Sequence, residues 1–170
     1  ETPVSELTVH FIDVGQADAA VLQCGDDTMM IDGGNVADSS LIVAYLKKLN
    51  IDNIDYMVCT HAHEDHVGGL SAPLSVMPVS AVYAPSAEAD SKAYQNFKRK
   101  AADQNTEIMH PENYESFPFG SARVEILACP DNADNLNNTS IILKVTHKNK
   151  SFLFTGDAER EEEQTLLDRG

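Results

Sequence analysis

Three histidines and two acidic residues fall within six consecutive positions at the end of an apolar segment, and a pair of glycines follows shortly after. The segment IDYMVCT covers residues 54 to 60, and HAHEDHVGG continues it over residues 61 to 69. The apolar run is short and rich in β-branched and aromatic residues, which predicts a buried strand. Any fold of this chain therefore has to deliver a group of coordinating side chains at the end of that strand.

The spacing within this cluster is typical of a metal site. His61 and His63 are two residues apart, and in an extended segment such residues project to the same side, so both rings can reach one ion. Asp65 and His66 are adjacent and converge only if the backbone changes direction, as in a turn that enters a helix at about Asp65. Imidazole and carboxylate are ligands of borderline and hard divalent ions, so we expect a second ion beside the first.

Two alternative interpretations of the cluster are weaker. Histidines can lie together by chance in a polar loop, but four coordinating groups between a buried strand and Gly68-Gly69 argue against chance. The spacing also differs from H-E-x-x-H, which disfavours a zincin-type protease. The two glycines lack Cβ atoms and would let backbone approach closely at this point.

Strands and helices alternate along the rest of the chain. Apolar runs at 7–15, 19–24 and 28–34 predict an antiparallel meander. Apolar residues at helical spacing or charged helix-forming runs predict helices over 39–50, 91–105 and 158–169. Further strands are expected at 79–84, 106–110, 122–129, 139–147 and 150–157. This order predicts that residues 1–170 form a single domain. It favours the α+β (or α/β) class, with two sheets face to face and helices outside.

Composition limits the classes of function. The formal net charge of −15 argues against binding nucleic acid through a basic surface, although bound divalent ions would add positive charge locally. The three cysteines, Cys24, Cys59 and Cys129, show no CxxC spacing, so buried thiols are expected. No apolar run is long enough to span a membrane. The chain opens on Glu1, so an upstream signal could have been removed, and we expect an extracytoplasmic or secreted protein.

The cluster and two further segments resemble the metallo-β-lactamase superfamily of metal-dependent hydrolases. TxHxHxDHxGG after a strand is the signature of that superfamily, Asp32-Gly33-Gly34 matches its early Asp-Gly, and FLFTGDA (152–158) matches its later strand. The resemblance implies a four-layer αββα sandwich with two Zn²⁺ ions, or Mn²⁺ or Fe in their place. It assigns Asp157 as the bridging ligand and Asp65 as the catalytic residue that orients the nucleophile or takes its proton. The implied metal ligands are His61, His63, Asp65, His66 and Asp157.

A narrower resemblance concerns substrate and partners. HFIDVGQADAAVLQ (10–23) is similar to the opening of the hydrolase domain of ComEC-type DNA-uptake proteins and their stand-alone relatives, and NNTSIILKV followed by FLFTGD is similar to two later strands. It implies a phosphodiesterase or nuclease acting on nucleic acid or a small phosphodiester. The parent would be a membrane-bound bacterial protein, without membrane contact from this segment. The alternatives are hydrolysis of an ester, lactone or β-lactam, or a non-catalytic module of an uptake complex.

The chain departs from the family pattern in three places. Ala17 replaces a usual glycine, which is a minor change. The stretch 129–141 holds no histidine, although many superfamily members supply one there. Asn137 or Asn138 stands near that place, unless these residues only form a turn. The late His-His-Gly-Ser-like segment does not occur, so we expect either truncation at the C-terminus or an incomplete second metal site.

Other polar residues have two interpretations each. Asp18 and Gln16 shape the pocket according to the resemblance, or they are turn residues. Asp32 orients a ligand histidine, or it is a turn aspartate before two glycines. For Lys98-Arg99-Lys100 the exposed face of a helix is favoured over contact with an anionic substrate. Structural or surface positions are expected for the remaining histidines, His10, His110 and His147.

Overall fold

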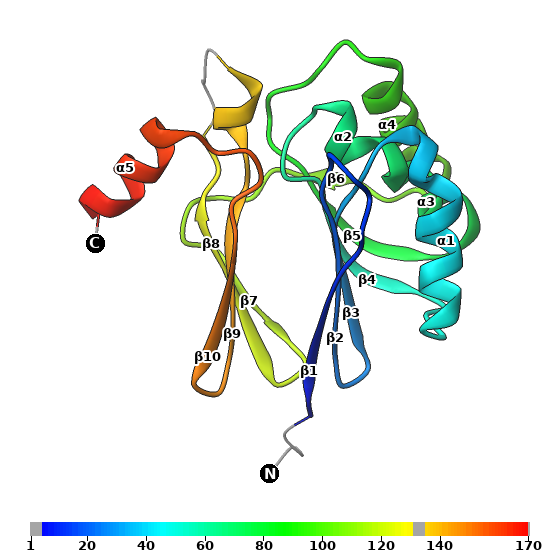
Figure 1. Cartoon of the computed structure of the whole chain (residues 1–170), viewed down its shortest axis with the longest axis horizontal. Coiled ribbons are helices and arrows are strands. Elements are labelled where there is room, and N and C mark those ends of the chain that lie inside the picture. Colours follow the sequence, from blue (N-terminus) through cyan, green and yellow to red (C-terminus); the bar gives the residue numbers. More distant parts are fainter. Residues whose placement is uncertain (1–4, 131–134, 170) are drawn as a thin grey trace.

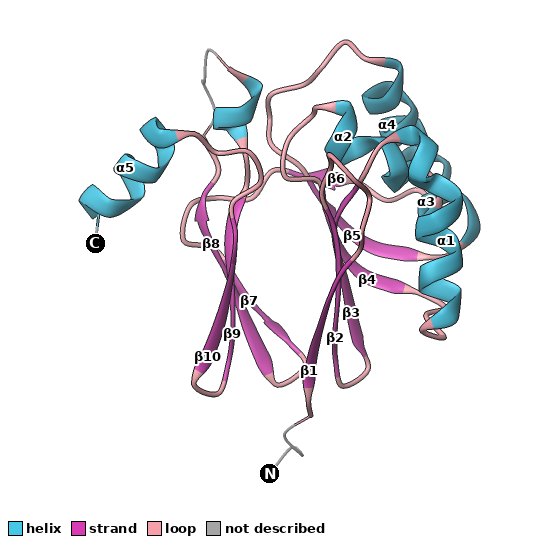
Figure 2. Cartoon of the chain, viewed as in Figure 1, coloured by secondary structure: helices cyan, strands magenta, loops and turns pink. Residues whose placement is uncertain are grey.

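Two β-sheets pack face to face in the computed structural model of the chain, which describes residues 5–130 and 135–169 (Figures 1 and 2). The six-stranded sheet has the order β1 (Leu7–Phe11), β2 (Ala19–Cys24), β3 (Asp27–Gly33), β4 (Ile54–Val58), β5 (Val79–Tyr83) and β6 (Ile108–Met109). The four-stranded sheet has the order β10 (Lys150–Phe154), β9 (Ile142–His147), β8 (Ala122–Ala128) and β7 (Ser116–Phe119). The predicted α+β class with two facing sheets is therefore confirmed.

Helices cover the outer face of the six-stranded sheet (Figure 2). They are α1 (Ser39–Lys48), α2 (Glu64–Val67), α3 (Pro73–Val76) and α4 (Lys92–Asp103), with short 3-10 helices η1 (Val36–Asp38) and η2 (Gly68–Ser71). Two more, η3 (Leu136–Thr139) and α5 (Arg160–Arg169), flank the four-stranded sheet. Helix α5 lies beyond the end of β10 and not across the outer face of that sheet (Figure 1), so the described residues form three of the four expected layers.

The six-stranded sheet changes from antiparallel to parallel at β3. The predicted meander is present, because β1 pairs with β2 and β2 with β3 in antiparallel register. Strands β3 to β6 then pair in parallel, with α1 and α4 in the long crossover connections that parallel strands require. The carboxyl ends of β3, β4 and β5 consequently meet at one edge of the sheet.

The four-stranded sheet is antiparallel throughout, and one of its strands was not expected from the sequence. Strand β7 contains Pro118, which speaks against a central strand because proline cannot donate a ladder hydrogen bond. The structure resolves this difficulty by placing β7 at the edge of the sheet, paired only with β8 among the described strands. Strands β9 and β10, both expected from the sequence, form a hairpin with Lys148 in the left-handed backbone region.

Strand alternation divides the core into two apolar layers. On β2 and β3, Val21 and Met30 face the helices, whereas Leu22 and Met29 face the second sheet, and all four are fully buried. This two-sided burial explains why β2 and β3 are almost continuously apolar. All three cysteines are buried, as expected. Among the described residues, no helix is both long and apolar enough to cross a bilayer.

Candidate metal centre

The histidine cluster lies at the carboxyl end of β4, at the edge where the parallel strands finish. His61 follows directly after the buried residues Cys59 and Thr60, and His63 is the extended residue that precedes α2. Helix α2 begins at Glu64, close to the predicted turn at Asp65. Its single turn reverses the chain and brings the His66 ring back beside His61, with ring centroids 4.2 Å apart.

His61 and His63 converge as their spacing predicts. Nε2 of His61 lies 3.0 Å from Nδ1 of His63, and the two rings meet edge to face. The His61 ring is fully buried, and its Nδ1 lies 3.3 Å from the Thr60 hydroxyl. Two imidazole nitrogens therefore point into one small region.

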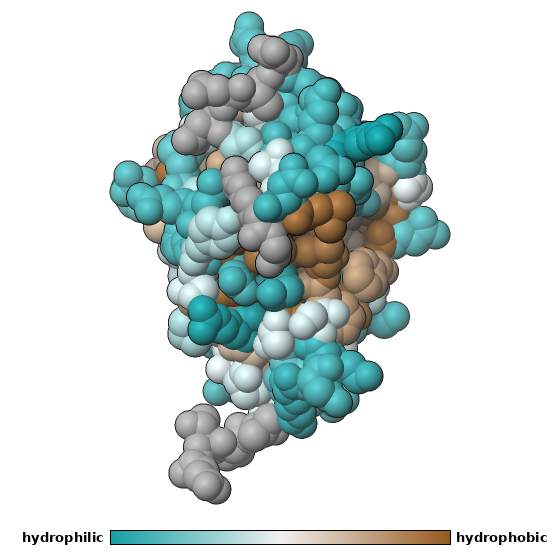
Figure 3. All heavy atoms as spheres, turned by 90° about the vertical axis from the view of Figure 1, so that its left-hand side faces the viewer, coloured by the Kyte–Doolittle hydropathy of each residue, from teal (hydrophilic) through white to brown (hydrophobic). Residues whose placement is uncertain are grey.

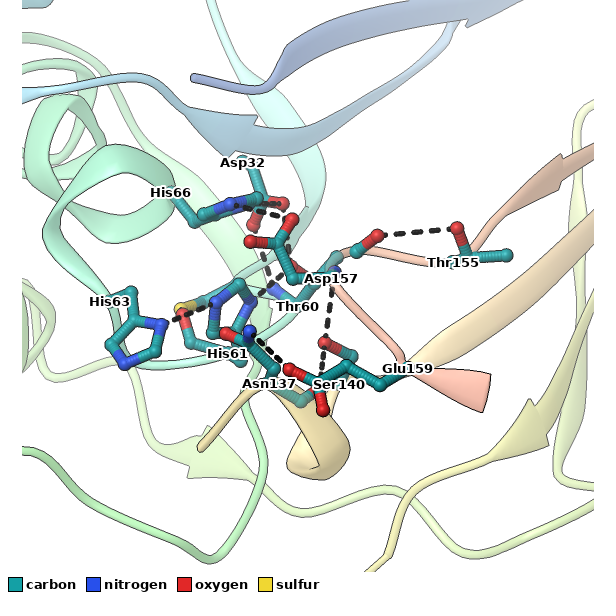
Figure 4. A network of polar contacts seen from close by, with 12 residues as sticks. Asp32, Thr60, His61, His63, His66, Asn137, Ser140, Thr155, Asp157 and Glu159 are labelled. Carbon is teal, nitrogen blue, oxygen red and sulfur yellow. Dashed lines mark hydrogen bonds and ion pairs between the residues drawn. The ribbon is translucent and has the colours of Figure 1, made fainter. Parts of the chain in front are cut away.

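His66 connects the two sheets. Its Nδ1 donates to Asp32 Oδ2 at 2.8 Å, and its Nε2 lies 3.2 Å from Asp157 Oδ1 (Figure 4). Asp32 belongs to β3 of the six-stranded sheet, whereas Asp157 follows β10 of the four-stranded sheet. The centre thus forms where the ends of both sheets meet.

Asp32 orients its neighbours from a buried position. The residue is 1% exposed, and its carboxylate accepts hydrogen bonds from the Thr60 amide (2.7 Å), the Thr60 hydroxyl (2.6 Å) and His66 Nδ1. Its φ of 56° lies in the left-handed region that Asp tolerates in turns. The structure therefore places Asp32 in β3 and not in a turn, with its carboxylate against His66 Nδ1, and its role in orienting a metal ligand stays a prediction.

The two buried histidines have opposite pKa shifts. Burial by itself would lower the pKa of His66, but the hydrogen bond and charge of Asp32, with the charges of Asp157 and Asp65, raise it to about 9. The pKa of His61 falls to about 3, mainly through burial and then through the neighbouring His66 and His63. Burial also raises the pKa of Asp18. His61 is consequently neutral, the form of histidine that binds metals.

The donor atoms fit a divalent ion. One ligand atom each from His61, His66 and Asp157 lies within 4.8 Å of the other two, and Asp18, Asp32 and His66 form a second such group. Imidazole and carboxylate are the donors that zinc and similar ions use. In the second group the Asp32 carboxylate already accepts three hydrogen bonds, so the first group is the better candidate.

The remaining predicted site residues lie around this group. Asp65 is half-buried, and its carbonyl accepts a hydrogen bond from the Asp18 amide at 3.3 Å, which ties the β1–β2 loop to α2. The roles assigned to Asp65 as ligand and catalytic residue stay predictions, as does the place of His63 in a metal shell. Asn138 is buried in η3, and its side chain bonds with the segment after Asp157. Residues 131–134 of the stretch without histidine lie outside the described residues.

A glycine shapes the loop that carries Asp157. Gly156 has a φ of +51°, and a Cβ atom there would lie 2.8 Å from both the Thr60 and the Ser140 hydroxyl oxygens. Only glycine allows the loop to pass this close to the histidine segment. The Asp157 amide then donates to the Ser140 hydroxyl at 3.2 Å.

A cavity of about 230 Å³ opens beside the centre between the two sheets. Asp18, Asp32 and Thr60 line its polar side, and its apolar side includes Phe11 and Leu153. These two side chains are 69% and 59% exposed, and apolar surface gathers on the face that holds β10 and α5 (Figure 3). Sequence reasoning missed both residues, because they come from strands of different sheets and each looks like an ordinary strand position.

The other histidines contact structural groups, as expected. His10 lies 3.2 Å from the Tyr45 hydroxyl, His110 lies 2.9 Å from the Ala84 carbonyl, and His147 lies 2.9 Å from the Ser5 carbonyl. The basic run at residues 98–100 is on α4, where Lys98 pairs with Glu88. That pairing is consistent with the outer face of a helix.

Sequence comparison identifies relatives among competence proteins. ComE operon protein 3 of Bacillus subtilis (strain 168) is 24% identical over 183 residues, which cover 96% of this chain and 24% of that protein. Competence protein ComA of Neisseria gonorrhoeae is 25% identical over 168 residues, covering 97% of this chain and 22% of that protein. The chain thus spans about a quarter of the length of these curated relatives.

Structure comparison supports the same fold. The crystal structure of metallo-β-lactamase SMB-1, bound to 2-mercaptoethanesulfonate, matches with a TM-score of 0.63 at 17% identity and covers 99% of this chain and 72% of that one. The sequence profile described as "Metallo-beta-lactamase superfamily" matches residues 12–127, a span that includes Asp32 and the whole histidine cluster. The chain therefore belongs to the metallo-β-lactamase superfamily.

Proposed function

We propose that the chain is a metal-dependent hydrolase that cleaves phosphodiester bonds. The observation that carries the proposal is the meeting of His61, His66 and Asp157, from two sheets, with donor atoms within 4.8 Å of one another. The hydrogen-bond partner of His66, Asp32, and the neighbour of His61, Thr60, line a cavity beside them. Membership of the superfamily and the fit of these donors to divalent ions support the hydrolytic chemistry.

The residues divide the work of the reaction. His61, His63, Asp65, His66 and Asp157 would hold one or two ions, with Zn²⁺ first and Mn²⁺ or Fe as alternatives. Such ions, when bound, lower the pKa of water and stabilise negative charge that develops on oxygen. Asp32 keeps the His66 ring in its coordinating orientation through the 2.8 Å hydrogen bond. Asp65 would orient the attacking water or take its proton.

Two arguments favour a phosphodiester substrate. The relatives named as competence proteins align with nearly all of this chain, and phosphodiester bonds join the nucleotides of DNA. The net charge of −15 disfavours a long duplex, which needs many basic contacts, and favours a short or small phosphodiester. A locally bound cation supplies the attraction that the surface lacks.

Hydrolysis of an ester, lactone or β-lactam is the second candidate function, and the apolar side of the cavity favours it. Phe11 and Leu153 offer an exposed apolar wall beside the centre, suited to an uncharged part of such substrates. A non-catalytic module of an uptake complex is the alternative outside the enzymes. It predicts a chain that binds less than one metal ion and hydrolyses none of these substrates.

The test uses purified chain loaded with Zn²⁺ or Mn²⁺. We expect turnover of bis(p-nitrophenyl) phosphate that depends on metal, is abolished by a chelator, and exceeds turnover of a chromogenic ester and a chromogenic β-lactam. Elemental analysis should give at least one ion per chain. Preference for the ester or the β-lactam would replace the phosphodiester proposal. No turnover together with less than one ion per chain would refute the hydrolase.

A further inference from the structure

The stretch from η3 to Ile141 lies against both parts of the chain that carry candidate ligands. Beside the histidine segment, the Ile141 amide donates to the Thr60 carbonyl at 2.8 Å. Beside the Asp157 loop, the Ser140 hydroxyl accepts from the Asp157 amide at 3.2 Å and donates to the Asn137 carbonyl at 2.7 Å. One hydroxyl therefore joins the backbone of Asn137 to that of a candidate metal ligand.

The Asn137 side chain has one atom without a partner. Its Nδ2 donates to Glu159 Oε1 at 3.0 Å, whereas its Oδ1 is buried and accepts no hydrogen bond from the described residues. Figure 4 shows Asn137 among the same group of polar side chains as His61 and Asp157, with its bond to Glu159 dashed. A buried acceptor without a donor costs free energy, which suggests that its partner is not part of the polypeptide.

Its neighbour Asn138 is fully engaged. Asn138 Oδ1 accepts from the Glu159 amide at 2.9 Å, and Nδ2 donates to Glu161 Oε2 at 3.3 Å. Both ends of that carboxamide hold the segment after Asp157 in place. Of the two asparagines in η3, only Asn137 has a buried side-chain oxygen that is free to bind an ion.

We propose that Asn137 Oδ1 is an oxygen ligand of the metal centre. The inference rests on the proposed function, in that an ion occupies the group formed by His61, His66 and Asp157. An amide oxygen is a neutral ligand and a harder one than imidazole. Carbonyl oxygens are better ligands for Mn²⁺ than for soft or borderline ions such as Zn²⁺. The Asn137 oxygen therefore narrows the gap between the affinities for Zn²⁺ and Mn²⁺.

The experiment measures metal affinity directly and does not depend on turnover. Metal-free full chain is titrated calorimetrically with Mn²⁺ and, separately, with Zn²⁺, for the parent, Asn137→Ala, Asn137→Asp and Ser71→Ala. The Ser71 hydroxyl is the matched control, because it is another buried oxygen without a partner among the described residues. It lies on η2, which packs against α4 on the helical side of the first sheet.

We expect Asn137→Ala to bind Mn²⁺ about 10-fold to 100-fold more weakly, the range for losing a group that supports a metal site, and to lose less affinity for Zn²⁺. Asn137→Asp keeps the oxygen and should bind Mn²⁺ at least as tightly as the parent. Ser71→Ala should bind like the parent. The metal-free Asn137→Ala chain should melt at or above the parent temperature, because an unpaired acceptor has been removed.

Three results would overturn the inference. They are parental Mn²⁺ affinity in Asn137→Ala, an equal loss in Asn137→Ala and Asn137→Asp, and an equal loss in Ser71→Ala. If Asn137→Ala does not fold, weaker Mn²⁺ binding by Asn137→Asp than by the parent overturns the inference as well. A parent chain that binds metal but hydrolyses nothing refutes only the proposed activity, whereas one that binds neither ion refutes both.

Discussion

At the residue scale, Asp32 is the buried carboxylate that accepts hydrogen bonds from both Thr60 and His66. Removing its charge leaves the shape of the side chain but weakens its hold on His66 Nδ1. We expect Asp32→Asn to lower metal affinity about 10-fold to 100-fold, as the loss of a group that orients a ligand histidine usually does. Calorimetric titration with Zn²⁺ measures the effect, and Asp26→Asn, in an exposed turn, is the control. Equal affinity in Asp32→Asn and the parent would contradict the orienting role.

Ser140 is a second residue whose effect should separate function from stability. Its hydroxyl joins Asn137 to the Asp157 amide. We expect Ser140→Ala to lower the free energy of unfolding by only about 1–2 kcal/mol, the usual effect of losing ordinary hydrogen bonds, so that the variant still folds. Metal-dependent kcat/KM should fall by a larger factor than this loss of stability explains, since the Asp157 amide loses its hydrogen bond to the Ser140 hydroxyl. Urea unfolding and kcat/KM measured on the same sample compare the two effects.

At the element scale, the turn from α2 into η2 depends on contact between two stretches of backbone. A Cβ atom at Gly69 would overlap the Gly33 carbonyl oxygen, and backbone cannot move aside as a flexible side chain can. We expect Gly69→Ala to destabilise the chain by about 1–3 kcal/mol or more, the cost of overpacking. Ser40→Ala on the exposed side of α1 should change stability little. Urea unfolding of both variants tests this, and a stable Gly69→Ala would show that the close approach is dispensable.

Elements also show where prediction from sequence succeeds. The meander, the helix at Ser39–Lys48 and the strand before the cluster follow from local periodicity, and the convergence of His61 with His63 follows from their spacing. Strand β7 does not, because Pro118 is acceptable only at an edge, and edge position is decided by tertiary structure.

Residue spacing in the sequence does not predict contacts between distant segments. Asp157 is some 90 residues from the cluster, and only the family resemblance connected it to His66. The apolar wall of Phe11 and Leu153 joins two sheets and has no sequence signal of its own. Likewise, Asn137 and Asn138 differ in the hydrogen bonds that their carboxamides make around η3, which adjacent positions in a sequence do not reveal.

At the scale of the whole molecule, a bound ion would join the two sheets. His61 and His66 belong to the six-stranded half, and Asp157 belongs to the four-stranded half. Because such an ion binds only the folded chain, we expect Zn²⁺ at 100 times its Kd to stabilise the chain by about 2.7 kcal/mol relative to chelator-treated chain. Thermal unfolding with and without Zn²⁺ measures the increment. Asp157→Ala should lose most of it, and an undiminished increment would place the ion elsewhere.

The position of the centre at the ends of the strands has an evolutionary consequence. His61, His66 and Asp157 all stand outside the regular strands, and the two apolar layers lie below them. Substitutions in these connections can therefore change the ligand set or the cavity wall while the interleaved side chains of the sandwich keep their packing. A scaffold of this kind lets new chemistries arise by loop replacement, since selection on catalysis and selection on folding act on different residues.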